Sequence, residues 1–196
     1  MTDVNTRTGA VVQGIGSGLT AMALFTPVYA IWPFFAWPLA GGVFFASALA
    51  WSVFLVVRAR SLMALSRTMP FEPDAFDRRL TKWIGVISSI QGVLILVSTI
   101  ALALLGLWTW ILPTVALIVA LHFFPMPALF GRTIDYYLGG GMLLVAVLGL
   151  HLASRATVDW PITWGVTGIG GTLVTSSYGI YMVISARRAL RAHFIT

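Results

Sequence analysis

Two histidines, His122 and His151, lie within strongly apolar stretches, where an ionisable side chain is costly and commonly marks a functional position. Histidine is a frequent axial ligand of haem iron, so a haem held by both rings is the first chemistry to consider. The helices that we predict carry the two rings at different depths, roughly 15 Å apart along the membrane normal at about 1.5 Å of rise per residue. One iron cannot bind both rings. We therefore predict no haem, no other cofactor and no metal site.

A second group of chemically active side chains surrounds the later histidine. His151, Arg155 and Asp159 recur at four-residue intervals. This spacing places them on one face of a helix, provided that the helix continues to Asp159. An imidazole, a guanidinium and a carboxylate together can exchange protons or hold an anionic headgroup. The simpler interpretation is an ordinary ion pair at a solvated helix end.

The earlier histidine stands before a proline-rich turn. His122 is followed by Pro125 and Pro127, which we expect to kink or end its helix because proline lacks the backbone N–H that a helix needs. Arg132 and Asp135 come next, near the expected membrane interface. This segment is the best candidate for a functional cluster, while a capped turn anchored by aromatic residues explains most of the same pattern.

Neutral polar side chains mark two further apolar stretches. Ser88, Gln91 and Ser98 fall on one side of a predicted helix, and Thr172, Thr175 and Ser176 lie at a comparable depth in another. If the two sides face each other, they either line a cavity for a small ligand or only hydrogen-bond two helices together. Gln91 has the most donors and acceptors that need partners. The candidate ligand-binding residues are therefore Gln91, Ser98, His122 and Thr175.

Small residues recur at four-residue intervals in two places. One ridge contains Gly14 and Gly18, and the other contains Thr167 and Gly171. Such ridges let helix backbones approach closely in lipid, where no hydrophobic force drives helices together. We expect these two ridges to pack inside a helix bundle. The alternative is that one of them joins copies of the chain.

The composition indicates what must hold these side chains in place. Of 196 residues, 59% are hydrophobic and only 9% are charged, with a mean hydropathy of +0.93. This is too little polar surface for a water-soluble globule, so most of the chain is expected to lie in lipid. The sequence has no cysteine, which excludes disulfides, thiolate metal sites and cysteine nucleophiles. We attribute the net charge of +6 to contact with membrane lipids and not to nucleic-acid binding.

Apolar runs of about 20 residues predict membrane-spanning helices. We therefore predict an all-α bundle of six transmembrane helices that forms a single integral membrane domain, since lone strands would leave backbone groups unpaired in lipid. The segment at 58–83 is expected to be cytoplasmic. The predicted spans are residues 10–31, 38–57, 84–106, 108–128, 136–154 and 161–186.

Charge predicts how the bundle is oriented. With both termini in the cytoplasm, all of the 12 lysine and arginine residues except Arg155 fall on the cytoplasmic side. The tryptophans give an independent indication, because six of the eight fall in or beside the three loops assigned to the outer side, where they would form an aromatic belt. These are Trp32, Trp37, Trp108, Trp110, Trp160 and Trp164. The location we predict is a bacterial inner membrane, which the arginine-rich composition favours.

The segment 111–130, which contains Leu121-His122-Phe123-Phe124-Pro125, resembles a group of small uncharacterised bacterial six-span membrane proteins. These proteins carry an L-H-F-x-P-like segment before a cytoplasmic turn. The resemblance covers roughly the third to fifth spans and implies no activity. In length and six-span topology alone, the chain is also similar to the substrate-binding subunits of energy-coupling-factor vitamin transporters.

Three functions are compatible with these patterns. The leading hypothesis is a membrane protein, not an enzyme, that binds or helps to transport a small neutral or amphipathic ligand. The first alternative is a structural subunit that assembles with membrane partners or with copies of itself. The second alternative is an interfacial enzyme that uses His122 with Asp135, or His151 with Asp159, for acid–base chemistry.

Overall fold

The computed structural model describes residues 4–69 and 75–194, and the regular elements within these ranges are helices. Six helical stretches are long and apolar enough to cross a membrane, which confirms the predicted six-helix membrane fold; two of them, Gly9–Ala36 and Trp108–Phe130, each join a long helix to a short one. The helices in chain order are α1 (Val4–Ala30), α2 (Pro33–Ala36), α3 (Pro38–Ser66), α4 (Ala75–Leu104), α5 (Trp108–Phe123), α6 (Met126–Phe130), α7 (Ile134–Ala153) and α8 (Trp160–Phe194).

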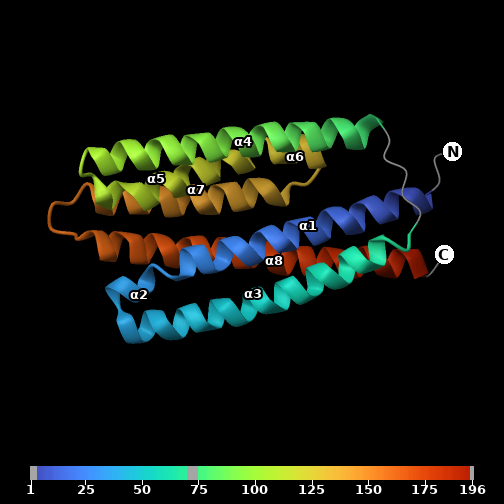
Figure 1. The fold of residues 1–196 in the computed structure, drawn as a ribbon, viewed down its shortest axis with the longest axis horizontal. Helices are drawn as coiled ribbons and strands as arrows, with labels where there is room; N and C mark the ends of the chain where they lie inside the picture. Colours follow the sequence, from blue (N-terminus) through green and yellow to red (C-terminus); the bar gives the residue numbers. More distant parts are fainter. Residues whose placement is uncertain (1–3, 70–74, 195–196) are drawn as a thin grey trace.

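Consecutive long helices pack as antiparallel pairs, as expected from their short connections. α1 packs on α3, α4 on α5, and α7 on α8. The central helix is α8, which contacts α1, α2, α3, α5 and α7. In Figure 1, α4 runs along the top edge and α3 along the bottom edge, and the other long helices lie between them.

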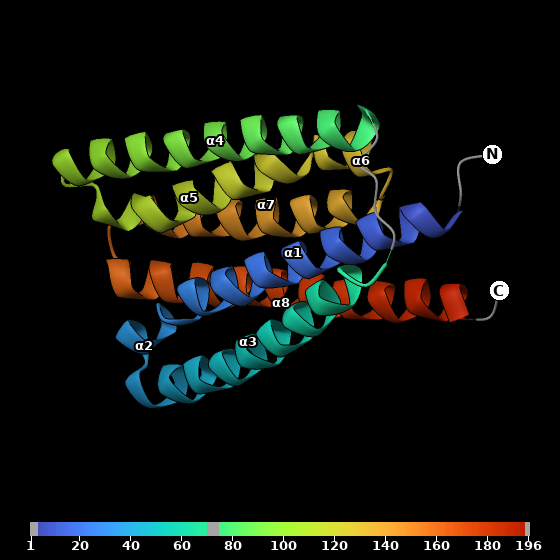
Figure 2. The ribbon, with the colours of Figure 1, turned by 45° about the vertical axis from the view of Figure 1, so that its right-hand side comes forward.

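The two ends of the bundle differ in composition. The start of α1, the end of α3, the start of α4 and the end of α8 lie at one end, on the right of Figures 1 and 2, together with the arginines of α3 and of late α8. We call this the basic end. The opposite end contains α2, the α4–α5 turn and the α7–α8 loop, where Trp32, Trp108, Trp160 and Trp164 lie. We call it the tryptophan end.

Proline and glycine set the helix boundaries at the turns. α5 ends at Phe123, just before Pro125, as predicted. Gly131 ends α6 in the left-handed conformation, with φ of +64°, and its N–H donates to the carbonyl of Pro127. Gly106 adopts a similar φ of +71° in the turn between α4 and α5. These two glycines let short turns join antiparallel helices.

α4 lies at the edge of the bundle. It packs extensively on α5 alone, and most of its side chains are exposed. A half-buried stripe, which includes Gln91 and Ser98, follows the side of α4 toward α5. These residues do not meet Thr172, Thr175 and Ser176 of α8, which was the condition for a polar surface shared by the two helices, because α5 and α7 lie between α4 and α8.

Candidate functional site

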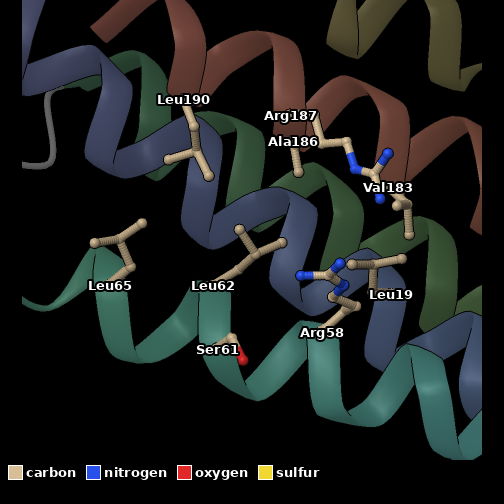
Figure 3. A pocket seen from close by; sticks show the side chains of 9 residues that line it. All are labelled: Leu19, Arg58, Ser61, Leu62, Leu65, Val183, Ala186, Arg187 and Leu190. Atoms are coloured by element: carbon tan, nitrogen blue, oxygen red, sulfur yellow. The ribbon is translucent and has the colours of Figure 1, made fainter. Parts of the chain in front are cut away.

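A groove opens at the basic end between α3 and α8, with α1 as its floor (Figure 3). Its cavity measures about 140 Å³, room for roughly four or five molecules of water at about 30 Å³ each. Leu19 of α1 is fully buried at the floor, and the helices on either side contribute mostly apolar side chains. The residues that line the groove are Leu19, Arg58, Ser61, Leu62, Leu65, Val183, Ala186, Arg187 and Leu190.

Two arginines give this apolar groove a strong positive charge. Arg58 extends from α3 and Arg187 from α8, and Figure 3 shows their guanidinium groups directed toward each other from opposite walls. Among the described residues, no carboxylate lines the groove and neither arginine forms an ion pair. The Arg58 guanidinium lies 5.5 Å from the centre of the Phe54 ring, which orients it and leaves its N–H groups unused.

The charge lies where a membrane changes from hydrocarbon to headgroups. α3 starts at Pro38 at the tryptophan end, and from there to Arg58 the helix rises about 30 Å at 1.5 Å per residue. That distance equals the thickness of a typical hydrocarbon core. Of the apolar lining residues, Leu19 and Val183 lie on the tryptophan-end side of the two arginines (Figure 3). An amphiphile can thus place an anionic group at Arg58 and Arg187 with its apolar chain beside Leu19 and Val183.

A second polar cluster joins α7 to α8. The Asp135 carboxylate is fully buried in the first turn of α7, and its Oδ2 lies 3.4 Å from Nε of Arg132. Arg132 also donates a hydrogen bond to the hydroxyl of Tyr178 on α8, with 2.9 Å between Nη2 and Oη, and stacks over Phe130. Arg132 thus links Asp135 of α7 to Tyr178 of α8, although Arg132 Nε and both carboxylate oxygens of Asp135 are buried without a hydrogen-bond partner in the described residues.

Thr175, a predicted ligand residue, takes part in interhelical packing. It is 4% exposed, and its hydroxyl donates to backbone carbonyls of its own helix. The Thr26 hydroxyl of α1 lies 3.2 Å from it and bonds to the Met22 carbonyl. The polar side of α8 therefore contacts α1.

The other predicted ligand residues lie on the α4–α5 pair. Gln91 is half-buried and forms no hydrogen bond with any described residue. Ser98 donates to the carbonyl of Ile95 in its own helix. His122 packs edge-on against Phe123, and its Nδ1 is buried without a hydrogen-bond partner in the described residues. Neither the groove nor a second cavity of about 200 Å³, lined by Arg79, Leu80, Trp83, Ala128 and Leu129, includes these three residues.

The structure separates the predicted group at the tryptophan end. α7 ends at Ala153, so Asp159 does not share a helical face with His151 as we expected. Arg155 does approach His151, with 3.3 Å between Nη2 and Nε2, and both side chains are exposed. Arg155 forms no ion pair with Asp159.

The small residues occupy three different environments. A Cβ added at Gly171 would lie 2.5 Å from the Tyr29 ring, and one at Gly18 would meet Met182 at a similar distance. Thr167 is fully buried and lies against Gly149 of α7. Gly14, in contrast, has no atom within 4 Å of an added Cβ, so the predicted packing within the bundle is wrong for this residue.

Sequence reasoning missed the residues of the groove. Arg58 and Arg187 were interpreted as determinants of orientation and as general contacts with membrane lipids, not as a site, and Tyr178 was not selected. A usable signal existed, because Arg58 directly follows the predicted span 38–57 and Leu62 and Leu65 follow it at helical spacing. The convergence of Arg58 with Arg187 depends on the crossing of α3 and α8, which no local pattern predicts.

A scan against protein-family models, a search of curated proteins and a search of solved structures each returned no match.

Proposed function

We propose that this integral membrane protein binds an amphipathic ligand with an anionic group in the groove between α1, α3 and α8. The observation that carries this proposal is the pair Arg58 and Arg187, which have no acidic partner among the described residues and border an apolar groove. The proposal keeps the amphipathic ligand expected from the sequence but replaces a neutral polar group with an anion. We place the basic end, and with it the groove, on the cytoplasmic side of a bacterial inner membrane.

The balance of charge and apolar surface favours an amphiphile over a water-soluble anion. Leu19 and Val183 offer apolar surface on the tryptophan-end side of the two arginines, and burying an apolar chain against such surface contributes about 25 cal/mol per Å². The two guanidinium groups supply charge-assisted hydrogen bonds at only one depth in the membrane. A ligand that uses both contributions needs an apolar tail and a charged head.

A photoreactive fatty acid tests this proposal. The purified full chain is labelled with a diazirine-bearing fatty acid and, separately, with its neutral methyl ester, and the crosslinked peptides are mapped by mass spectrometry. We expect the acid, but not the ester, to concentrate on the turns of α3 before Arg58 and of α8 before Arg187, near Val183. Equal labelling of the groove and of exposed α4 by both probes would contradict the proposal.

The assembly role is the second candidate, and one feature of α4 favours it. Gly85, Ser88, Ser89 and Gly92 are exposed on this edge helix, and nothing lies within 4 Å of a Cβ added at either glycine. Small residues of this kind allow two transmembrane helices to approach closely. The mass of the complex in mild detergent distinguishes a monomer from an assembly of copies.

A further inference from the structure

We infer that the groove between α3 and α8 selects a phospholipid whose headgroup carries both an anionic phosphodiester and hydroxyl groups, of the phosphatidylglycerol type. This inference rests on the proposed function and makes it more specific. It concerns which anion lies between Arg58 and Arg187, and which part of the headgroup meets Ser61.

The two arginines of the groove favour a phosphate as the bound anion. Both are arginines, whose planar guanidinium groups present paired N–H donors that match two oxygens of a phosphate. Two guanidinium groups that converge from opposite helices can each bind a different pair of oxygens on one tetrahedral group. A fatty-acid carboxylate offers two oxygens in one plane, which one arginine is sufficient to satisfy.

Ser61 favours hydroxyl groups on the headgroup. Among the described residues that line the groove it is the one neutral polar side chain, and it lies at the rim with its oxygen directed away from the two guanidinium groups (Figure 3). Its hydroxyl already donates to the carbonyl of Val57 at 2.9 Å. Its oxygen therefore remains available as an acceptor. A headgroup hydroxyl supplies the donor that this acceptor lacks, whereas a choline headgroup has no O–H or N–H and adds a positive charge close to two guanidinium groups.

The shape of the groove indicates that the ligand enters from the bilayer. α3 and α8 touch over a short part of their length only, and α1 closes the groove behind them. The opening thus lies along the side of the bundle, at the depth where the hydrocarbon core meets the headgroups. A lipid can diffuse into this opening without leaving its leaflet.

Native mass spectrometry of the full chain in a neutral detergent tests the inference. The probes are dioleoyl phosphatidylglycerol, dioleoyl phosphatidylcholine, oleate and glycerol 3-phosphate, each added at the same concentration. We expect phosphatidylglycerol to be retained at least about tenfold more than each of the others, which corresponds to roughly 1.4 kcal/mol. Equal retention of oleate would overturn the inference while leaving the proposed function intact. Equal retention of phosphatidylcholine would overturn both, and preferred retention of glycerol 3-phosphate would identify a soluble phosphate and also overturn both.

Variants of equal charge keep the test independent of folding. Arg58→Gln with Arg187→Gln removes the two groove cations, while Arg60→Gln with Arg188→Gln removes two exposed arginines outside the groove. We expect the first pair to lower phosphatidylglycerol retention about tenfold or more and the second to lower it less than about twofold. Ser61→Ala should reduce retention of phosphatidylglycerol but not of dioleoyl phosphatidic acid. Equal effects of the two charge pairs would show general electrostatic attraction and overturn the inference.

Discussion

The guanidinium of Arg132 donates a hydrogen bond to the hydroxyl of Tyr178, with 2.9 Å between Nη2 and Oη. This bond connects the turn before α7 to the middle of α8. The same guanidinium faces the buried carboxylate of Asp135, so one arginine holds both a neutral and a charged partner. The residues of this cluster fix α7 against α8, the helix that also carries one wall of the groove.

The Arg132 cluster leads to a prediction about stability. Arg132→Gln should lower the free energy of unfolding in detergent by about 3–5 kcal/mol, because it leaves the buried Asp135 carboxylate without a compensating charge. Tyr178→Phe should cost only about 1–3 kcal/mol, because it removes one hydrogen bond to a charged donor. Chemical unfolding followed by circular dichroism measures both.

A double variant provides the control for this prediction. In Arg132→Gln with Asp135→Asn, both charges are removed, so the loss should be smaller than for Arg132→Gln alone. If the losses measured for Arg132→Gln alone and for Asp135→Asn alone simply add in the double variant, the carboxylate and the guanidinium do not depend on each other, and our interpretation of the cluster is incorrect.

The small-residue ridges lead to a matched comparison. Gly171→Ala should destabilise the protein by about 1–3 kcal/mol, because the new methyl group would meet the buried ring of Tyr29. Gly14→Ala places its methyl group in open space and should change the stability by less than about 1 kcal/mol. Thermal unfolding of the two variants under identical conditions checks the difference. A larger loss for Gly14→Ala would mean that Gly14 contacts another molecule.

Gln91 should not contribute to the groove. Gln91→Leu replaces an amide that has no hydrogen-bond partner among the described residues with a side chain that suits lipid. We expect unchanged lipid retention and equal or higher stability. Retention is measured by native mass spectrometry beside the wild-type chain. A tenfold fall in retention would place the ligand on α4 and contradict the groove.

His151 and Asp159, which are exposed at the tryptophan end, should not be needed for stability or for lipid binding. His151→Ala and Asp159→Ala should each change the free energy of unfolding by less than about 0.5 kcal/mol, because these side chains are exposed and Asp159 has no ion pair in the described part of the chain. Lipid retention should also stay the same. Loss of binding in either variant, with normal unfolding, would reveal a second ligand site at this end.

The sequence predicted the positions of the helices better than it predicted which helices pack against each other. Length, hydropathy and short connections were sufficient for six helices and for the pairs α1–α3, α4–α5 and α7–α8, because these features depend on local composition. They were not sufficient for the position of α4. Which polar stripes meet depends on the order in which the pairs pack, and lipid on all sides gives no hydrophobic pattern that would reveal this order.

The dependence on how helices pack also explains which residues of the candidate site the sequence found and which it missed. Thr175 and Gly171 were recognised as polar or small residues of one helix side, and both lie against α1. Arg58 and Arg187 were recognised as basic residues near helix ends, yet their convergence depends on the angle at which α3 crosses α8. A single sequence contains the residue types of the groove but not that angle.

Analysis of the lipid that purifies with the protein tests the central proposal most directly. The wild-type chain, the groove variant Arg58→Gln with Arg187→Gln, and the charge control Arg60→Gln with Arg188→Gln are purified from membranes in mild detergent, and bound lipids are extracted and quantified. We predict about one anionic phospholipid per chain in the wild type and in the charge control, and a strong loss in the groove variant. Equal lipid content in all three preparations would contradict an anion-binding groove between α3 and α8.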